Sequence, residues 1–245
     1  MTPALACIAF ELDGQPATAF EGETILKAAE RHGVQIPRLC FTDGLRADGN
    51  CRACVVEVDG ERTLAPSCCR AVQPGMKVRA ASERARRAQD MVLELLLAEL
   101  PAAGFKWLDD DATQPHGELS QWASQRKVGV RQQLQNLQRP RPTPDLSHPA
   151  MAVNLDACIQ CTRCVRACRE EQANDVIGYA FRGEHAKIGF DLDDPMGESS
   201  CVGCGECVQA CPTGALAPAR GAGLVVADRK VDSVCPYCGV GCLLT

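Results

Sequence analysis

The residues of this sequence that could do chemistry are its cysteines, which number 17 among 245 residues. Clustered thiols either pair as disulfides or bind metals as thiolates. The N-terminus lacks the positively charged start and apolar run of a secretion signal. We therefore expect a cytoplasmic protein, and in that reducing compartment clustered cysteines are more often metal ligands than disulfides.

Eight cysteines form two runs that share the spacing C-x2-C-x2-C-x3-C, and Pro212 follows the second run. The first run is Cys158, Cys161, Cys164 and Cys168; the second is Cys201, Cys204, Cys207 and Cys211. This spacing is typical of ferredoxins with two [4Fe–4S] clusters, in which the fourth cysteine of each run ligates the other run's cluster. The spacing thus predicts two crossed ligand sets. They are Cys158, Cys161, Cys164 and Cys211 for one cluster, and Cys201, Cys204, Cys207 and Cys168 for the other.

A third group of cysteines lies nearer the N-terminus, in a loop rich in Gly, Asp and Asn and in the hairpin that follows it. Its members are Cys40, Cys51, Cys54 and Cys68. One close pair with two more distant thiols favours a [2Fe–2S] cluster over zinc, which as a rule is bound by two close pairs. Cys69 is an alternative to Cys68, because neighbouring side chains on a strand point to opposite faces and only one should ligate.

The last 15 residues, VDSVCPYCGVGCLLT, hold a fourth group, Cys235, Cys238 and Cys242, spaced C-x2-C-x3-C. A [4Fe–4S] cluster takes four ligands. We therefore expect this site to be incomplete within the 245 residues. Cys7 and Cys69 are left over, and Cys7 on an apolar strand is most simply a buried small side chain.

The expected fold is α+β, in four segments. Residues 1–80 should form a β-grasp [2Fe–2S] domain with a helix over 22–33 and a hairpin turn at Asp59 and Gly60. Residues 81–149 should be a helical connector that starts at an N-cap Ser82 and ends in a Pro-rich linker. Residues 150–220 should form the domain with two [4Fe–4S] clusters, and 221–245 the start of a further domain.

Charge and hydropathy exclude two classes of partner. The net charge is −5 and no basic stripe is present, so we expect no nucleic acid. The longest apolar stretch, residues 91–100, is short and interrupted by Glu94 and Glu99, so we expect no membrane span. Arg163, Arg166 and Arg169 alternate with the cysteines of the first run; a solvated face is favoured there over a docking patch.

These motifs together resemble the N-terminal iron–sulfur portion of the α subunit of soluble NAD-dependent formate dehydrogenase, a molybdenum or tungsten enzyme. The resemblance is carried by PRLCFTDGLRADGNCRACVVEVDGERTLAPSCCR, by LSHPAMAVNLDACIQCTRCVRACREEQANDVIGYA, by the second cysteine run and by VCPYCGVGC. The last motif is similar to the start of a molybdopterin-binding domain, in which a fourth cysteine downstream completes a [4Fe–4S] site.

The resemblance implies an electron relay. In that family, electrons from formate oxidation at a bis-molybdopterin guanine dinucleotide reach a flavin and NAD-binding subunit, with a small [2Fe–2S] subunit in the same complex. The chain itself would lack the catalytic domain and would not turn over formate alone.

Two other interpretations stay open. One is a free-standing polyferredoxin-like carrier. The other is a diaphorase subunit of an NAD-reducing hydrogenase or a complex I-like enzyme. Subunits of that second kind carry a further His-x3-Cys-x2-Cys-x5-Cys site, whereas this sequence has no cysteine between Cys69 and Cys158.

Overall fold

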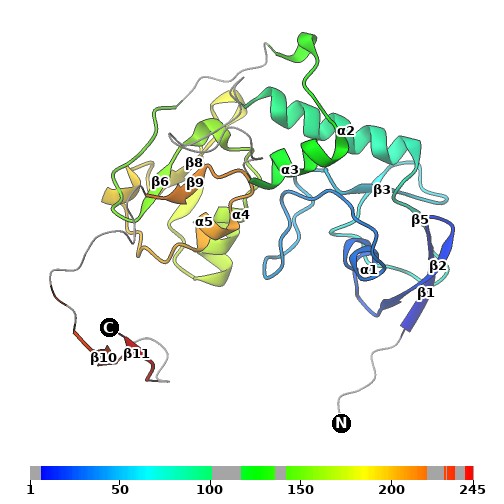
Figure 1. The fold of residues 1–245 in the computed structure, drawn as a ribbon, viewed down its shortest axis with the longest axis horizontal. Helices are drawn as coiled ribbons and strands as arrows, with labels where there is room; N and C mark the ends of the chain where they lie inside the picture. The colour runs from blue at the N-terminus through cyan, green and yellow to red at the C-terminus, as the bar shows by residue number, and fades with distance from the viewer. Residues whose placement is uncertain are drawn as a thin grey trace.

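The fold is seen in a computed structural model, which describes residues 7–100, 117–135, 142–219, 229, 231–234 and 241–244. It is α+β, as expected, with a β-rich N-terminal half and a loop-rich half that holds both cysteine runs (Figure 1). No helix in this described part is long and apolar enough to cross a membrane.

The N-terminal half is built on a five-stranded mixed sheet in the order β2-β1-β5-β3-β4. Its elements are β1 (Cys7–Leu12), β2 (Gln15–Phe20), α1 (Ile25–Arg31), β3 (Val55–Val58), β4 (Ala65–Pro66) and β5 (Lys77–Arg79). Strands β1 and β5 pair in parallel and the other pairs are antiparallel. This order, with one helix packed on the sheet, is the expected β-grasp arrangement.

Local chemistry explains the elements of this half. Asp13 and Gly14 take positive φ values of 48° and 80°, which suits the tight β1–β2 turn. The Thr24 side chain caps α1 by accepting from the Lys27 amide. Ile25 and Leu26 on α1 are fully buried against the sheet, so their burial holds the helix on it.

One cysteine of this half differs from the prediction. Cys7 is exposed at the start of β1, whereas Phe10 and Leu12 of the same strand are buried. Side chains alternate between the two faces of a strand, so the odd-numbered positions of β1 point away from the core. The prediction of a buried Cys7 is therefore wrong.

Two helices connect the halves (Figure 1). They are α2 (Glu83–Ala98), capped by the Ser82 hydroxyl as expected, and α3 (Gly117–Arg126); the 3-10 turn η1 (Gln132–Leu134) follows. Leu93 of α2 and Leu119 of α3 share an apolar cluster with Leu39 of the N-terminal half and Ala157 and Ala215 of the other half. The connector thus joins the two halves through a common core.

The second half is made of short elements around the cysteine runs. Its strands are β6 (Met151–Val153), β7 (Ile177–Ala180), β8 (Lys187–Phe190) and β9 (Leu216–Pro218), and its helices are α4 (Arg163–Arg166) and α5 (Glu206–Ala210). Its other turns are η2 (Leu155–Ala157), the π-helical η3 (Ala167–Glu171), η4 (Gly183–His185) and η5 (Met196–Glu198). Strand β6 pairs with β9 and β7 with β8, both antiparallel.

The ends of the connector and of the chain add two details. Asp145, in the Pro-rich segment, bridges to Val153, and its carboxylate accepts from the Met196 amide at 2.7 Å. The described part of that segment is therefore fastened to the second half. Near the C-terminus, β10 (Ser233–Val234) pairs with β11 (Leu243–Leu244).

Candidate metal centres

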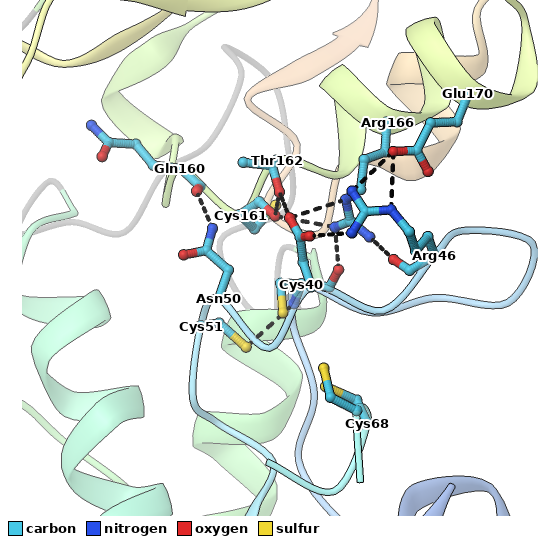
Figure 2. Close-up of polar contacts among 12 residues, drawn as sticks. Cys40, Arg46, Asn50, Cys51, Cys68, Gln160, Cys161, Thr162, Arg166 and Glu170 are labelled. Carbon is cyan, nitrogen blue, oxygen red and sulfur yellow. Dashed lines mark hydrogen bonds and ion pairs between the residues drawn. The ribbon is translucent and has the colours of Figure 1, made fainter. Parts of the chain in front are cut away.

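The four thiols of the N-terminal group converge. Cys40 lies in the loop after α1, Cys51 and Cys54 precede β3, and Cys68 follows β4. The Cys40 amide points at the Cys51 sulfur at 3.4 Å, and Figure 2 shows Cys40, Cys51 and Cys68 around one space. The β-grasp sheet therefore brings three separate stretches of chain to one point.

The electrostatics of this group are those of coupled thiols. Hydrogen bonds from the Cys51 and Cys68 thiols lower the pKa of Cys40 to about 2, and a hydrogen bond from Cys68 lowers the pKa of Cys54 to about 7. The same hydrogen bonds, together with burial, raise the pKa of Cys51 and of Cys68. Four thiols so close together cannot all ionise unless a cationic group compensates them, and an iron–sulfur centre does so.

Cys68 and Cys69, whose sulfurs lie 3.6 Å apart, differ in their burial and in their contacts with the other thiols. Cys68 is fully buried and hydrogen-bonds to Cys40 and Cys54, whereas Cys69 is exposed. A Cβ on Gly49, which has φ +62°, would lie 3.0 Å from the Cys69 sulfur, so the loop needs glycine there. Cys68 is thus the thiol that faces the group.

A small cavity collects the first predicted [4Fe–4S] set. Its lining includes Cys158, Cys161, Cys164 and Cys211, with apolar side chains such as Ile188 and with Pro212. Burial raises the pKa of Cys161 to about 12, and nearby Cys158 and Cys211 add to the rise. The fourth thiol of the second run therefore lies with the first three of the first run, in a pocket of sulfur and hydrocarbon that suits a cluster.

The other crossed set also comes together. Burial raises the pKa of Cys207 to about 12, and the thiols that add to this rise are Cys201, Cys204 and Cys168. Cys207 and Cys168 are buried, whereas Cys204 is exposed. This set therefore faces solvent on one side.

The two runs fold alike around their sulfurs. The amide of Gln160 points at the Cys158 sulfur at 3.4 Å, and the amide of Gly203 points at the Cys201 sulfur at the same distance. Amides directed at sulfur stabilise added negative charge there and raise the reduction potential of a bound cluster. The described cysteines form no disulfide.

A single metal ion needs its ligands closer together than an iron–sulfur cluster does. No three Cys, His, Asp or Glu side chains among the described residues have the geometry of such a site. The assignment of the centres therefore depends on the convergence and coupling of the thiols. Of the terminal group, Cys242 is exposed, and Cys235 and Cys238 lie outside the described residues.

The arginines of the first run differ from the prediction. Arg163 and Arg166 do not form a solvated face, since they are only 2% and 3% exposed, while Arg169 does lie at the surface and pairs with Asp175. Arg163 donates to the Leu39 carbonyl at 3.2 Å and to Glu118 at 2.8 Å. The prediction was wrong because nothing in the spacing of these arginines shows that the N-terminal half packs over the first run.

Each half of the chain matches a different known protein family. Residues 6–83 match the 2Fe-2S iron-sulfur cluster binding domain family. Residues 148–217 match the ferredoxin-like domain of NADH-quinone oxidoreductase subunit 3.

Curated relatives extend the match across the connector. A subunit of the NADH-quinone oxidoreductase of Rhizobium meliloti is 33% identical over 239 residues, which are 96% of this chain and 27% of the relative. The HndD subunit of the NADP-reducing hydrogenase of Solidesulfovibrio fructosivorans is 32% identical over 223 residues, 86% of this chain and 36% of the relative. The chain is therefore similar to one part of each of these oxidoreductase subunits. It spans about a third or less of their length.

A solved structure resembles the fold as well. It is that of an NAD+-reducing [NiFe]-hydrogenase in the H2-reduced state, with a TM-score of 0.74 and 27% identity over 87% of this chain and 88% of that one. These three relatives are named as NADH-, NADP- or NAD-linked enzymes, and none of the three is a formate dehydrogenase. The hydrogenase and complex I-type alternative is therefore better supported than the formate dehydrogenase interpretation.

Proposed function

We propose that this chain is an iron–sulfur electron-transfer module of an NAD(P)-linked oxidoreductase complex. One observation carries the proposal: three groups of four thiols lie together in the chain, and two of these groups combine three cysteines of one run with the fourth cysteine of the other. In this proposal a [2Fe–2S] centre is held by Cys40, Cys51, Cys54 and Cys68. Two [4Fe–4S] centres are held by Cys158, Cys161, Cys164 and Cys211 and by Cys201, Cys204, Cys207 and Cys168.

Bound at these sites, the clusters would supply one-electron transfer with little rearrangement of their ligands. The chain's own residues set the conditions for it. The apolar lining around Cys161 and Cys164 keeps water away from the first site, while the exposed side of Cys204 leaves the second site open to solvent or to a partner.

The chemistry of electron transfer to NAD indicates one kind of partner. NAD accepts a hydride, a two-electron unit, and cysteine-ligated clusters pass single electrons, so a flavin is needed to convert one into the other. We therefore include a flavin and NAD-binding partner subunit in the proposal. We also include a small [2Fe–2S] subunit, which the resemblance to soluble formate dehydrogenase implies. The curated relatives are themselves named as subunits.

A second candidate is the corresponding part of a formate dehydrogenase. The observation that favours it is the terminal spacing of Cys235, Cys238 and Cys242, which is similar to the start of a molybdopterin-binding domain. In that case a further [4Fe–4S] centre and a molybdenum or tungsten pterin would belong to the full subunit. Formate-dependent reduction of NAD by the complex purified from its source would support it, and hydrogen-dependent or NADH-dependent reduction alone would exclude it.

The test of the main proposal is the metal content of the chain after anaerobic reconstitution. We expect about ten irons and as much acid-labile sulfide, from one two-iron and two four-iron centres. Serine variants of Cys69 and Cys7 serve as matched controls and should keep this content. A protein that binds zinc and little iron, or that holds only two to four irons, would overturn the proposal.

A further inference from the structure

Among the contacts between the N-terminal thiol loop and the first cysteine run, those of the buried Arg166 of α4 reach the backbone of both (Figure 2). Its Nη2 donates to two main-chain carbonyls, those of Cys40 and Cys161, the second at 3.3 Å. Its Nη1 donates to the Arg46 carbonyl. A single guanidinium thus bonds to the backbone of one proposed ligand from each of two centres.

A shell of polar contacts holds this arginine in place. The Asp48 carboxylate lies 3.6 Å from its Nε and accepts from the Thr162 hydroxyl at 3.1 Å. Arg46 bonds both to Asp48, at 2.8 Å, and to Glu170 of the second half, at 3.0 Å. The charge of Arg166 is therefore partly balanced by Asp48. Its orientation is fixed from both sides of the junction, by which we mean the contact between the N-terminal thiol loop (residues 39–54) and the first cysteine run with the residues that follow it (158–170).

The second cysteine run offers an internal comparison. Arg166 lies two residues after the third cysteine of its run, and the same position in the second run is occupied by Gln209, which is exposed. Arg163 is also buried at the junction, but it bonds to the Leu39 carbonyl and Glu118, so it ties helix α3 and the loop rather than two ligand residues. Arg166 differs from Arg163 because its acceptors are the carbonyls of two proposed ligand residues, Cys40 and Cys161.

We infer that Arg166 is a positioning residue shared by the [2Fe–2S] centre and the nearer [4Fe–4S] centre. It holds the main chain at Cys40 and at Cys161 in one fixed relation, and it places a buried positive charge beside both. Arginine suits this role, because its planar fork donates in several directions at once and stays charged when buried. The inference rests on the proposed function, since it takes Cys40 and Cys161 as ligands.

Replacing Arg166 should therefore change the loop stability and the reduction potential at both centres. The Cys40 and Cys161 carbonyls lose a common donor, so both loops should open more often to solvent. Reduction adds negative charge to a cluster, and a nearby positive charge favours that state. Without the guanidinium, both centres should become harder to reduce.

The experiment uses the full chain with reconstituted clusters and compares Arg166→Gln, Arg166→Lys and Arg169→Gln. Arg166→Gln gives the first run the residue type of the second run at this position. Arg166→Lys keeps the charge but has a single nitrogen, so it cannot reproduce the fork. Arg169→Gln is the matched control, because Arg169 lies in the same segment with an exposed side chain paired to Asp175.

Two readouts separate a shared role from a merely structural one. We expect Arg166→Gln to speed amide hydrogen exchange over residues 39–54 and 158–166 and to shift the potentials of both centres downward in redox titrations followed by electron paramagnetic resonance. Arg166→Lys should speed the exchange but shift the potentials less. If Arg166→Gln does not accumulate as folded protein, Arg166→Lys is judged by exchange at both loops.

Arg166→Gln or Arg166→Lys behaving like Arg169→Gln, or a change confined to one centre, would overturn the inference. That result leaves the proposed function standing if the wild-type chain shows all three centres. A wild-type chain with no cluster signals would instead overturn the proposed function itself.

Discussion

The two cysteine runs share one loop conformation between their first and third cysteines, and they differ in their surroundings. In both, the third and fifth residues take positive φ: Gln160 at 54° and Thr162 at 65° in the first run, Gly203 at 70° and Gly205 at 78° in the second. The fifth residue is the N-cap of the following helix in each case, α4 or α5. The spacing thus builds one loop conformation twice.

The difference lies in what covers each loop. Around the first run, the Gln160 carbonyl accepts from Asn50 at 3.1 Å and the Thr162 hydroxyl bonds to Asp48. In the second run, Val202 is 69% exposed and Cys204 is exposed as well. Non-glycine residues with positive φ cost about 1 kcal/mol each. The first run offsets that cost with contacts to the N-terminal half, and the second run avoids it with glycine.

This comparison suggests how one cysteine spacing, used twice, comes to lie in two different surroundings. The thiol spacing and the loop before the third cysteine are the same in both copies, and the residues between the thiols decide which copy is buried against the neighbouring half. In the first copy, Arg163 and Arg166 serve that junction, whereas Glu206 and Gln209 stand at the corresponding positions of the second.

The largest effect is expected when the fourth cysteine of either run is replaced by serine. Cys211→Ser should remove the cluster of the buried first site, because Cys211 lines the cavity with Cys158, Cys161 and Cys164. Cys168→Ser should instead remove the cluster of the exposed second site. Each variant should lose about four irons and one [4Fe–4S] signal by iron analysis and electron paramagnetic resonance.

The identity of the lost cluster is decided by comparison with Cys161→Ser and Cys204→Ser. Cys211→Ser should match Cys161→Ser in its spectrum, and Cys168→Ser should match Cys204→Ser. The reverse pairing would show that each run holds its own cluster.

A smaller effect is expected when a glycine with positive φ in the second run is replaced by a residue that has a side chain, as the first run has at the same position. Gly203→Ala introduces a side chain at φ +70°, where the nearest atom is a ring carbon of His148 at 3.7 Å, so strain rather than a clash sets its cost. We expect a loss of about 1 kcal/mol, seen as a fall of a few degrees in the midpoint of anaerobic thermal unfolding.

Gly178→Ala is the control for that substitution, because a Cβ there meets nothing within 4 Å and its φ is ordinary. It should leave the midpoint nearly unchanged. Equal midpoints for the two variants would mean that the second loop does not need glycine.

The smallest effect is expected at the edge of the junction. Asn50→Ala removes one hydrogen bond to the Gln160 carbonyl, which keeps its bond from the Tyr179 hydroxyl at 2.6 Å. We expect a loss of about 0.5–1 kcal/mol in the same unfolding measurement. Asp175→Ala breaks an exposed ion pair with Arg169 and should cost less. A larger loss for Asp175→Ala would contradict the importance given to the junction.

The sequence predicted the features that depend on local spacing. The β-grasp half, the capped helix from Ser82 and the convergence of the crossed thiols follow from periodicity, from capping residues and from the ligand spacing of the runs. The choice of Cys68 over Cys69 could not be made, because it depends on how the end of β4 is turned toward Cys40 and Cys54.

The junction itself was beyond prediction from the sequence. Asp48, Asn50 and Glu170 are ordinary polar residues, and their contacts join positions more than a hundred residues apart. An arginine between two cysteines has the same sequence signal whether it faces water or a neighbouring domain. Only the packing of Leu39 and Ala53 against Ala157 and Leu93 shows which surface is covered.

The proposed function requires three iron–sulfur centres in this chain, two of them with ligands exchanged between the cysteine runs. The most direct measurement is an anomalous iron map from crystals of the anaerobically reconstituted chain. We expect three iron peaks: one among Cys40, Cys51, Cys54 and Cys68, one beside Cys161 that reaches Cys211, and one beside Cys204 that reaches Cys168. Peaks that join Cys161 to Cys168 and Cys204 to Cys211, or no iron among the N-terminal thiols, would contradict it.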